Sequence, residues 1–260
     1  MAGRITIEKQ GALGFLIFDH PERRNAISVE MWKEIPQAAA ELERDGDVRV
    51  VILRGVGEVA FVAGADISEF ERTRSGGNVE DYDRDNARAF AALTNIAKPV
   101  LAMIHGFCVG GGMAIALTAD MRYAADDVQM GIPAAKLGLG YGMAGIEVLS
   151  RLVGSSRAME IFFTAKRFGP EAALRMGLLN DVFPKDRLES EVIAIAETIA
   201  KNAPLTVGAV KLTVRQLHRQ PADRDVDAVK RAIAACYASE DYKEGVSAFL
   251  QKRPAAFKGR

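Results

Sequence analysis

The sequence predicts an α/β fold, because buried-looking strands alternate with segments of helical periodicity along most of the chain. Residues 48–54 form a nearly continuous β-branched and aliphatic run, as expected for a strand covered on both faces. Residues 99–105 form a second such run, which leads through Gly110, Gly111 and Gly112 into an alanine-rich apolar segment. Strands that alternate with helices favour a parallel sheet with crossover connections.

The first part of the chain predicts a strand pair followed by a helix. Residues 4–8 and 13–18 alternate between apolar and polar positions around a turn at residues 9–12. Helical periodicity then extends over residues 28–44, with Ser28 as the expected N-cap and with a proline inside that favours a kink.

Between the two buried strands, the sequence predicts a loop, a mobile segment and a helix. Residues 62–67 are mostly small and are expected to form a loop. Residues 72–85 are charged and contain two adjacent glycines, so we expect them to be exposed and mobile. A helix over residues 86–96 then leads to the central strand.

The second half of the chain shifts from mixed structure to helices. Short strands are expected at residues 121–125, 128–130 and 181–184, and helices at residues 146–152, 157–164 and 171–176. From Leu188 onward the pattern is helical, with breaks at residues 202–204 and 220–221. We therefore predict an α/β core over residues 1–190 and a helical region over residues 191–260, whose apolar faces pack on the core or on another subunit.

Composition narrows the possible partners. The 34 basic and 34 acidic residues cancel, which gives no electrostatic reason to expect nucleic acid or an anionic membrane as partner. The N-terminus lacks the apolar core of a signal peptide, and no apolar run approaches the length of a membrane span, so a cytoplasmic protein is expected. The two cysteines and three histidines are scattered, and we predict no metal site.

The glycines at residues 110–112 have two possible roles. The first amides of a helix have no intrahelical acceptor and point outward as donors, and the helix dipole favours a negative oxygen at that position. Glycine also allows a ligand to approach the backbone closely. Alternatively, the glycines serve only a close contact between helix and strand, and the glycine pattern alone leaves both roles open.

A series of motifs in a fixed order resembles the crotonase, or enoyl-CoA hydratase/isomerase, superfamily. The resemblance extends from about residue 5 to the C-terminus, which makes it far more specific than one glycine motif. The motifs are His20-Pro21, Asn25-Ala26, residues 61–67, Lys98-Pro99-Val100, Gly106 with residues 110–112, residues 138–140, 164–167 and 177–180, and residues 249–258.

This resemblance implies a spiral of ββα units with a C-terminal helical trimerisation region. It also implies a homotrimer or a hexamer built as a dimer of trimers. The implied ligand is an acyl-CoA thioester, with coenzyme A as part of the substrate and no further cofactor. Residues 1–190 would bind the acyl-CoA, and residues 191–260 would mediate oligomerisation.

By position, the resemblance assigns an oxyanion hole to the backbone amides of Ala65 and Gly111. Removing one such donor typically costs about 3–4 kcal/mol of transition-state stabilisation. The same resemblance places the adenine of CoA against the loop that begins at Ala63. The residues implied in binding CoA are Ala63, Ala65, Asp66 and Ile67 through the loop, and Arg24, with Arg23 as an alternative, and Lys258 through its phosphates. A lysine common at the Ser68 position is missing here.

The chain differs from the family pattern at the residues that transfer protons. The two glutamates of the hydratases correspond to Ala114 and Ala134, and the aspartate used by other members corresponds to Gly142. Hydration needs a base and an acid, each worth roughly 10²–10⁴-fold in rate. Because alanine supplies neither, the resemblance predicts the binding site better than the reaction.

Three hypotheses about function follow. The protein is an acyl-CoA enzyme of the hydratase/isomerase type with a relocated acid or base, for which Glu147 is the candidate. Alternatively, it is an acyl-CoA decarboxylase, because Tyr141 lies close to where methylmalonyl-CoA decarboxylases of this superfamily carry a tyrosine, although their histidine at the Ala65 position is absent. The third possibility is a catalytically inactive acyl-CoA-binding protein.

Overall fold

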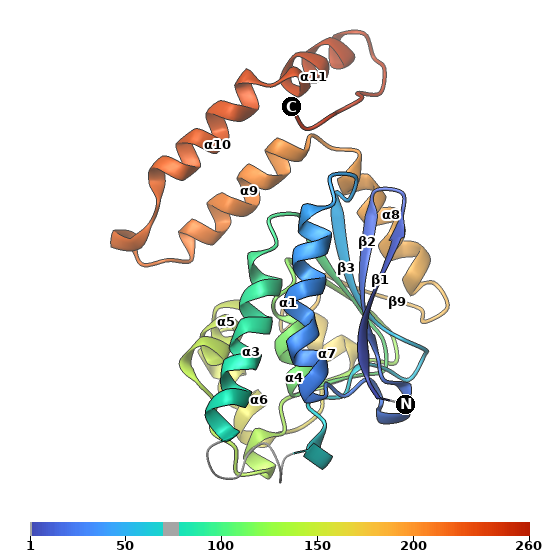
Figure 1. The fold of residues 1–260 in the computed structure, drawn as a ribbon, viewed down its shortest axis with the longest axis vertical. Helices are drawn as coiled ribbons and strands as arrows, with labels where there is room; N and C mark the ends of the chain where they lie inside the picture. Colours follow the sequence, from blue (N-terminus) through green and yellow to red (C-terminus); the bar gives the residue numbers. More distant parts are fainter. Residues whose placement is uncertain (1, 70–77) are drawn as a thin grey trace.

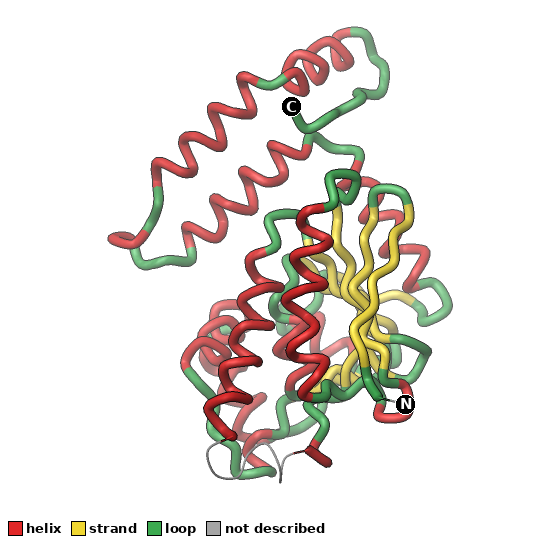
Figure 2. Tube along the Cα trace, viewed as in Figure 1, coloured by secondary structure: helices red, strands yellow, loops and turns green. Residues whose placement is uncertain are grey.

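The computed structural model describes residues 2–69 and 78–260, and it shows two sheets, their flanking helices and a helical arm (Figures 1 and 2). The larger sheet has six strands in the order β1-β2-β3-β5-β7-β9, and the smaller has three in the order β4-β6-β8. Strands β1 and β2 pair antiparallel, whereas the other pairs are parallel. The predicted α/β fold is confirmed.

The strands of the larger sheet are β1 (Arg4–Gln10), β2 (Leu13–Asp19), β3 (Val50–Gly55), β5 (Val100–Ile104), β7 (Met121–Ala125) and β9 (Asp181–Phe183). Those of the smaller sheet are β4 (Ala60–Val62), β6 (Phe107–Val109) and β8 (Gln129–Gly131). From β3 onward, successive strands alternate between the two sheets, and helices α3 (Asn78–Asn95) and α4 (Gly111–Ala116) follow β4 and β6. This repeated strand, strand, helix order is the predicted spiral of ββα units.

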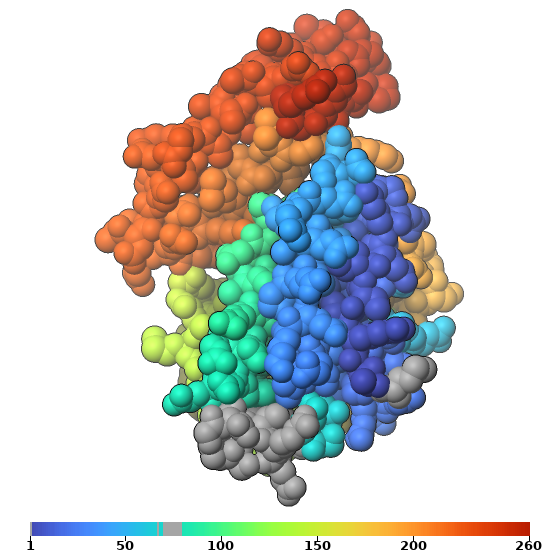
Figure 3. Space-filling view, viewed as in Figure 1, coloured from blue at the N-terminus to red at the C-terminus, as the bar shows by residue number. Residues whose placement is uncertain are grey.

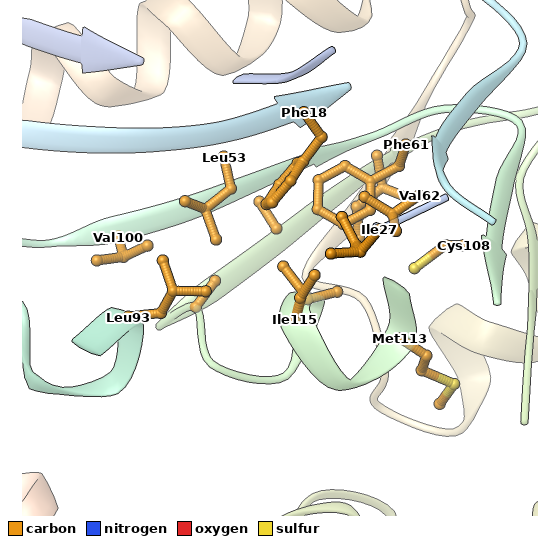
Figure 4. Packing of buried hydrophobic residues seen from close by; sticks show 14 of the residues in the cluster. Phe18, Ile27, Leu53, Phe61, Val62, Leu93, Val100, Cys108, Met113 and Ile115 are labelled. Atoms are coloured by element: carbon orange, nitrogen blue, oxygen red, sulfur yellow. The ribbon is translucent and has the colours of Figure 1, made fainter. Parts of the chain in front are cut away.

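Both faces of the inner strands of the larger sheet are buried, as the apolar runs of β2, β3 and β5 predict. Alternate side chains point to opposite faces, so Val50 and Ile52 pack on helix α8 (Leu188–Ala200), whereas Val51 and Leu53 face the other helices. The second face is covered by α3, α4 and α1 (Val29–Arg44). Figure 4 shows part of this core, where the Phe18 and Phe61 rings meet edge to face. Their ring centroids are 5.6 Å apart.

Helix α1 begins as predicted. The Ser28 Oγ accepts a hydrogen bond of 3.3 Å from the Met31 amide, and this N-cap satisfies a donor that the first turn leaves unpaired. Pro36 lies inside the helix, which remains assigned as one element to Arg44. Its buried face includes Met31, Trp32 and Ile35.

Two predictions about the middle of the chain were wrong in part. Helix α3 begins at Asn78, eight residues before the predicted start at Asn86, so residues 78–85 are helical rather than a loop. The rest of the predicted mobile segment, residues 72–77, lies outside the described residues. Strands β4 and β6 were also not predicted, because each has three residues and adjoins a glycine-containing segment, which favours a loop in the sequence.

The remaining helices lie in the second half of the chain. They are α5 (Met143–Val153), α6 (Ser155–Thr164), α7 (Pro170–Arg175), α9 (Pro204–Leu217), α10 (Val226–Ala238) and α11 (Glu240–Leu250), in addition to α8. Short 3-10 turns lie at Pro21–Arg23, Ile67–Glu69, Ala134–Lys136 and Pro221–Asp223. In the described part of the chain, none of the helices is both long and apolar enough to cross a bilayer.

Helices α9, α10 and α11 form an arm that projects from the core (Figures 1 and 3). Polar contacts hold the C-terminal half of α9 to the core. The Lys211 Nζ donates a hydrogen bond to the Lys98 carbonyl at 2.6 Å, and Arg215 donates one to the Ile96 carbonyl at 2.9 Å. The preceding helix, α8, packs on the sheet. The division into residues 1–190 and 191–260 remains a prediction.

Candidate active site

Two glycine-containing loops meet where β4 ends and where α4 begins. Gly64 and Gly110 both have a positive φ, at 110° and 56°, which residues with a side chain rarely adopt. A Cβ added to Gly111 would lie 3.5 Å from the Ala65 nitrogen. The structure therefore brings together Ala65 and Gly111, the two residues whose backbone amides the family resemblance places in one site.

Hydrogen bonds fix the direction of the Ala65 amide. The Ile27 N–H donates to the Gly64 carbonyl at 2.8 Å, and the Asp66 N–H donates to the Ile27 carbonyl at 2.9 Å. In such a parallel bridge, the residue between these two groups directs its own N–H away from the partner strand. The amide of Ala65 therefore points away from Ile27.

The amide of Gly111 is placed by the packing of α4. A Cβ on Gly112 would lie 2.0 Å from the Val62 carbonyl oxygen, so only glycine lets the helix sit this close to β4. The Gly110 N–H donates to the Gly131 carbonyl at 2.8 Å, which fixes the turn before the helix. Gly111 is the first residue of α4, where an amide has no partner within the helix.

Within residues 2–69 and 78–260, no acceptor is assigned to the N–H of Ala65 or of Gly111. Two donors that lie side by side and are held by the backbone suit an oxygen on which negative charge develops. A thioester carbonyl that becomes an enolate or a tetrahedral oxyanion is such a group. The arrangement can thus polarise a carbonyl without any side chain.

Trp32 forms a wall of this site that the sequence patterns did not indicate. Its ring atom Cζ2 lies 3.6 Å from the position that a Gly111 Cβ would occupy. The indole is 2% exposed and meets the Phe90 ring edge to face at 5.3 Å. An aromatic residue on the buried face of an amphipathic helix gives no signal of a site, since core packing explains it equally well.

Ala114 and Ala134 lie near the same glycine turn. The Ala114 N–H donates to the Gly110 carbonyl at 3.0 Å, one turn along α4. Pro133, which precedes Ala134, has its Cδ 3.8 Å from the position of a Gly110 Cβ. Neither alanine can transfer a proton, so any acid or base must come from elsewhere.

Tyr141 and Glu147 differ in their surroundings. Tyr141 is half-buried, and its ring meets the Phe162 ring edge to face at 4.9 Å. Glu147 lies on α5 with its side chain 54% exposed, and its carboxylate accepts a 2.6 Å hydrogen bond from Arg151 on the same helix. In the single chain, Glu147 is a solvent-facing ion-pair partner.

The loop expected to bind adenine is held by its own hydrogen bonds. The Ala63 N–H donates to the Arg24 carbonyl at 3.1 Å. The Asp66 carboxylate accepts hydrogen bonds from the Ser68 amide and hydroxyl, at 3.0 and 2.6 Å, where the turn Ile67–Glu69 begins. Burial alone would raise the pKa of Asp66, but the bonds from Ser68 outweigh it and leave the pKa below its ordinary value.

Two guanidinium groups lie over one aromatic ring near this loop. The Arg24 guanidinium is 5.0 Å from the centroid of the Phe107 ring, and that of Arg167 is 5.1 Å from it. Stacking on an aromatic ring holds an arginine while its N–H groups remain available to a phosphate. The contact of Arg24 with a CoA phosphate remains a prediction, and Arg167 is an additional cation beside Arg24 that the sequence patterns did not indicate.

Lys258 lies far from these groups within one chain. It belongs to the C-terminal segment beside α11, at the opposite end of the molecule from the loop that contains Ala65 (Figure 1). Its amide donates to the Asp241 carboxylate at 2.6 Å. Among the described residues, no cluster of three or more His, Cys, Asp or Glu side chains could hold a metal ion.

Comparison with known proteins agrees with this fold. The family model described as enoyl-CoA hydratase/isomerase matches residues 8–260. A short-chain-enoyl-CoA hydratase from Clostridium acetobutylicum is 35% identical over 98% of both chains. A crotonyl-CoA hydratase from Syntrophomonas wolfei is 34% identical over 97% of both chains.

Solved structures show the same likeness. An enoyl-CoA hydratase/carnithine racemase from Magnetospirillum magneticum superimposes with a TM-score of 0.92 at 30% identity, covering 98% of this chain and 96% of the other. An enoyl-CoA hydratase from Bacillus anthracis gives a TM-score of 0.89 at 29% identity, covering 99% of this chain and all of the other. The fold and these matches thus define a crotonase-fold acyl-CoA enzyme. The chain belongs to the enoyl-CoA hydratase/isomerase family.

Proposed function

We propose that the protein binds an acyl-CoA thioester with its carbonyl oxygen between the amides of Ala65 and Gly111, and that it processes this thioester through an enolate-like state. The observation that carries the proposal is the convergence of these two amides, with 3.5 Å between the Ala65 nitrogen and the Gly111 Cβ position. Ala63, Ala65, Asp66 and Ile67 would contact the adenine through the loop, and Arg24 would contact a phosphate of CoA.

The two alanines at positions 114 and 134 restrict the reaction. An oxyanion hole stabilises the developing charge, but hydration also needs a group that deprotonates water and one that protonates carbon. In this proposal Glu147 is the relocated acid or base. Since its carboxylate is paired with Arg151 in the single chain, it would have to leave that ion pair to act on the substrate.

Activity assays with four thioesters test the proposal: crotonyl-, 3-hydroxybutyryl-, methylmalonyl- and glutaconyl-CoA. Hydration of crotonyl-CoA that is lost in Glu147→Gln but kept in Arg151→Gln would support the relocated carboxylate. Binding of thioesters with no turnover would favour a catalytically inactive acyl-CoA-binding protein. If calorimetry detects no binding of any of the four, acyl-CoA recognition itself is wrong.

Decarboxylation is the second candidate, and it is supported by the position of Tyr141 in the sequence, close to where methylmalonyl-CoA decarboxylases of this superfamily carry a tyrosine. Loss of carbon dioxide from methylmalonyl-CoA leaves an enolate that the paired amides stabilise, and it needs no general base. The ring of Tyr141 packs against that of Phe162, and in this proposal the Tyr141 hydroxyl orients the carboxylate of the substrate. Release of carbon dioxide that slows at least tenfold in Tyr141→Phe would support this reaction, whereas an unchanged rate would exclude the role of Tyr141.

We also propose that copies of the chain assemble as a homotrimer or as a dimer of trimers. Large apolar side chains are exposed on α5 and on the arm, including Met143 at 88% and Phe249 at 84%. A groove of about 780 Å³, lined mostly by apolar side chains, lies between α9, α10 and α11. Burial of such surfaces against another copy explains why the sequence keeps them apolar.

A further inference from the structure

Trp32 directs a polar edge toward the paired amides. The atom of its ring closest to the Gly111 Cβ position is Cζ2, at 3.6 Å. The indole nitrogen Nε1 is two covalent bonds from Cζ2, on the same edge of the ring. The N–H of Trp32 therefore lies on the side of the indole that faces the oxyanion hole.

This N–H is a buried donor without an assigned acceptor. The residue is 2% exposed, and no acceptor for Nε1 is found in residues 2–69 and 78–260. An indole nitrogen can only donate, and a buried donor that lacks an acceptor destabilises a folded protein. Such groups are rare in native structures, and each calls for an explanation, of which a role in ligand binding or catalysis is one.

Packing holds the indole in this orientation. Its ring meets Phe90 of α3 edge to face at 5.3 Å, while Trp32 itself belongs to α1, so the contact joins two helices. On the other side is the backbone of α4 at Gly111. The donor is thus fixed before a ligand arrives, as a specificity contact requires.

We propose that Trp32 is a specificity-determining residue whose N–H donates to an oxygen on the acyl chain. The substrates it selects are thioesters of acids that carry a keto or hydroxyl oxygen close to the thioester carbonyl, where the reaction neither adds nor removes that oxygen. Because the indole borders Gly111, the oxygen it reaches lies within a few bonds of the carbonyl held there. This inference rests on the proposed function, namely that a thioester carbonyl binds between Ala65 and Gly111.

Two ligands of equal chain length test the inference. Acetoacetyl-CoA carries a keto oxygen on its β-carbon, and butyryl-CoA has hydrogens there. Isothermal titration calorimetry on the intact protein is expected to show tighter binding of acetoacetyl-CoA by about tenfold, the value typical of one neutral hydrogen bond in a dry site. Trp32→Phe keeps an aromatic ring without the donor, and it is expected to reduce this preference to about twofold or less.

Phe90→Leu is the matched control. It loosens the packing of Trp32 but keeps its N–H, so it is expected to weaken both ligands while most of the preference remains. If the unmodified protein binds both thioesters equally, or if Trp32→Phe keeps the full preference, the inference is overturned and the proposed function stands. If neither thioester binds to the unmodified protein, the proposed function itself fails.

A second measurement needs no variant and covers the case in which Trp32→Phe does not fold. The chain contains a single tryptophan, so its intrinsic fluorescence reports on Trp32 alone. Donation from the indole N–H to a ligand oxygen is expected to move the emission to longer wavelength with acetoacetyl-CoA and much less with butyryl-CoA. The same emission change with both ligands would contradict the inference.

Discussion

At the scale of single residues, two adjacent glycines of α4 have different roles, one in the binding site and the other in folding. A Cβ on Gly111 would make ordinary contacts, at 3.5 Å from the Ala65 nitrogen and 3.6 Å from Trp32. A Cβ on Gly112 would instead lie 2.0 Å from the Val62 carbonyl oxygen, which is backbone and cannot move aside. The first position borders the paired amides, and the second is part of the core.

We therefore expect Gly111→Ala to fold normally and to lose thioester processing, because its methyl group enters the space between the two amides. Activity should fall by about 10²–10³-fold, the usual cost of one oxyanion-hole donor. If no activity is found, weaker binding of thioesters in calorimetry provides the measurement. Wild-type binding by Gly111→Ala would show that the carbonyl does not lie there.

For Gly112→Ala the expected loss is in stability. Forcing a methyl group against fixed backbone typically costs 1–3 kcal/mol, and the 2.0 Å approach places this variant at about 3 kcal/mol or more. Thermal or urea unfolding measures the loss. A variant as stable as the unmodified protein would mean that α4 can move away from β4 at little cost.

Residue types alone allowed only part of the site to be predicted. The glycine pattern indicated donors at the start of α4, and the family motifs paired them with Ala65. Nothing in the sequence indicated that Trp32 of α1 borders Gly111, because this contact depends on how two helices pack over one sheet. The stacking of Arg24 and Arg167 on Phe107 likewise joins three segments that are distant in sequence.

At the scale of elements, the strands were easier to predict than the helix boundaries. Continuous apolar runs such as residues 48–54 reflect burial on both faces, which the structure confirms for β3. The start of α3 was missed because its first two turns are mostly charged. The buried residues of its described part, Tyr82, Ala89 and Leu93, come after these turns begin, so its apolar face gives no signal of the first turn.

The contact of α9 with the core depends on a buried lysine. The side chain of Lys211 is 8% exposed, and its Nζ donates to Asp120 at 2.5 Å and to the Lys98 carbonyl at 2.6 Å. Burial lowers the pKa of Lys211 from 10.5 to about 8, although Asp120 opposes this effect. In the unfolded chain the same lysine keeps its ordinary pKa.

Between these two values the unfolded chain binds more protons than the folded one, so the free energy of unfolding should rise with pH from about 8 to 10.5. This difference in pKa corresponds to roughly 3 kcal/mol. Lys211→Met, which keeps the length without the charge, should abolish most of the rise, as measured by urea unfolding across this range. Lys230→Met removes an exposed lysine and should leave the rise intact. An equal rise in both variants would assign it to other groups.

At the scale of the whole molecule, the arm exposes several large apolar side chains to solvent. Phe249 is 84% exposed and Leu250 75%, and both border the groove between α9, α10 and α11. An apolar patch of this kind on a protein surface typically marks an interface. We expect the patch to be covered by another copy of the chain.

Phe249→Glu should therefore weaken assembly, because a carboxylate would be buried in the contact between copies. Sedimentation velocity is expected to show a shift from trimer or hexamer toward monomer, while the circular dichroism of the helices stays unchanged. Lys243→Glu, an exposed change on the same helix, serves as the control and should assemble normally. A Phe249→Glu protein that sediments like the unmodified one would place the interface elsewhere.

Assembly also decides whether Lys258 can contact CoA. Within one chain this residue lies on the arm, at the opposite end from Arg24, so any contact between Lys258 and a CoA phosphate at the Arg24 site must cross to another copy. Lys258→Ala is then expected to weaken a CoA thioester by about two- to fivefold, the effect of one exposed charge, and to leave a pantetheine thioester of the same acid unaffected. Combined with Phe249→Glu, the substitution should have no further effect, because the monomer cannot bring the lysine to a neighbouring site. A full loss in that double variant would show that Lys258 acts within its own chain or on the fold of the arm.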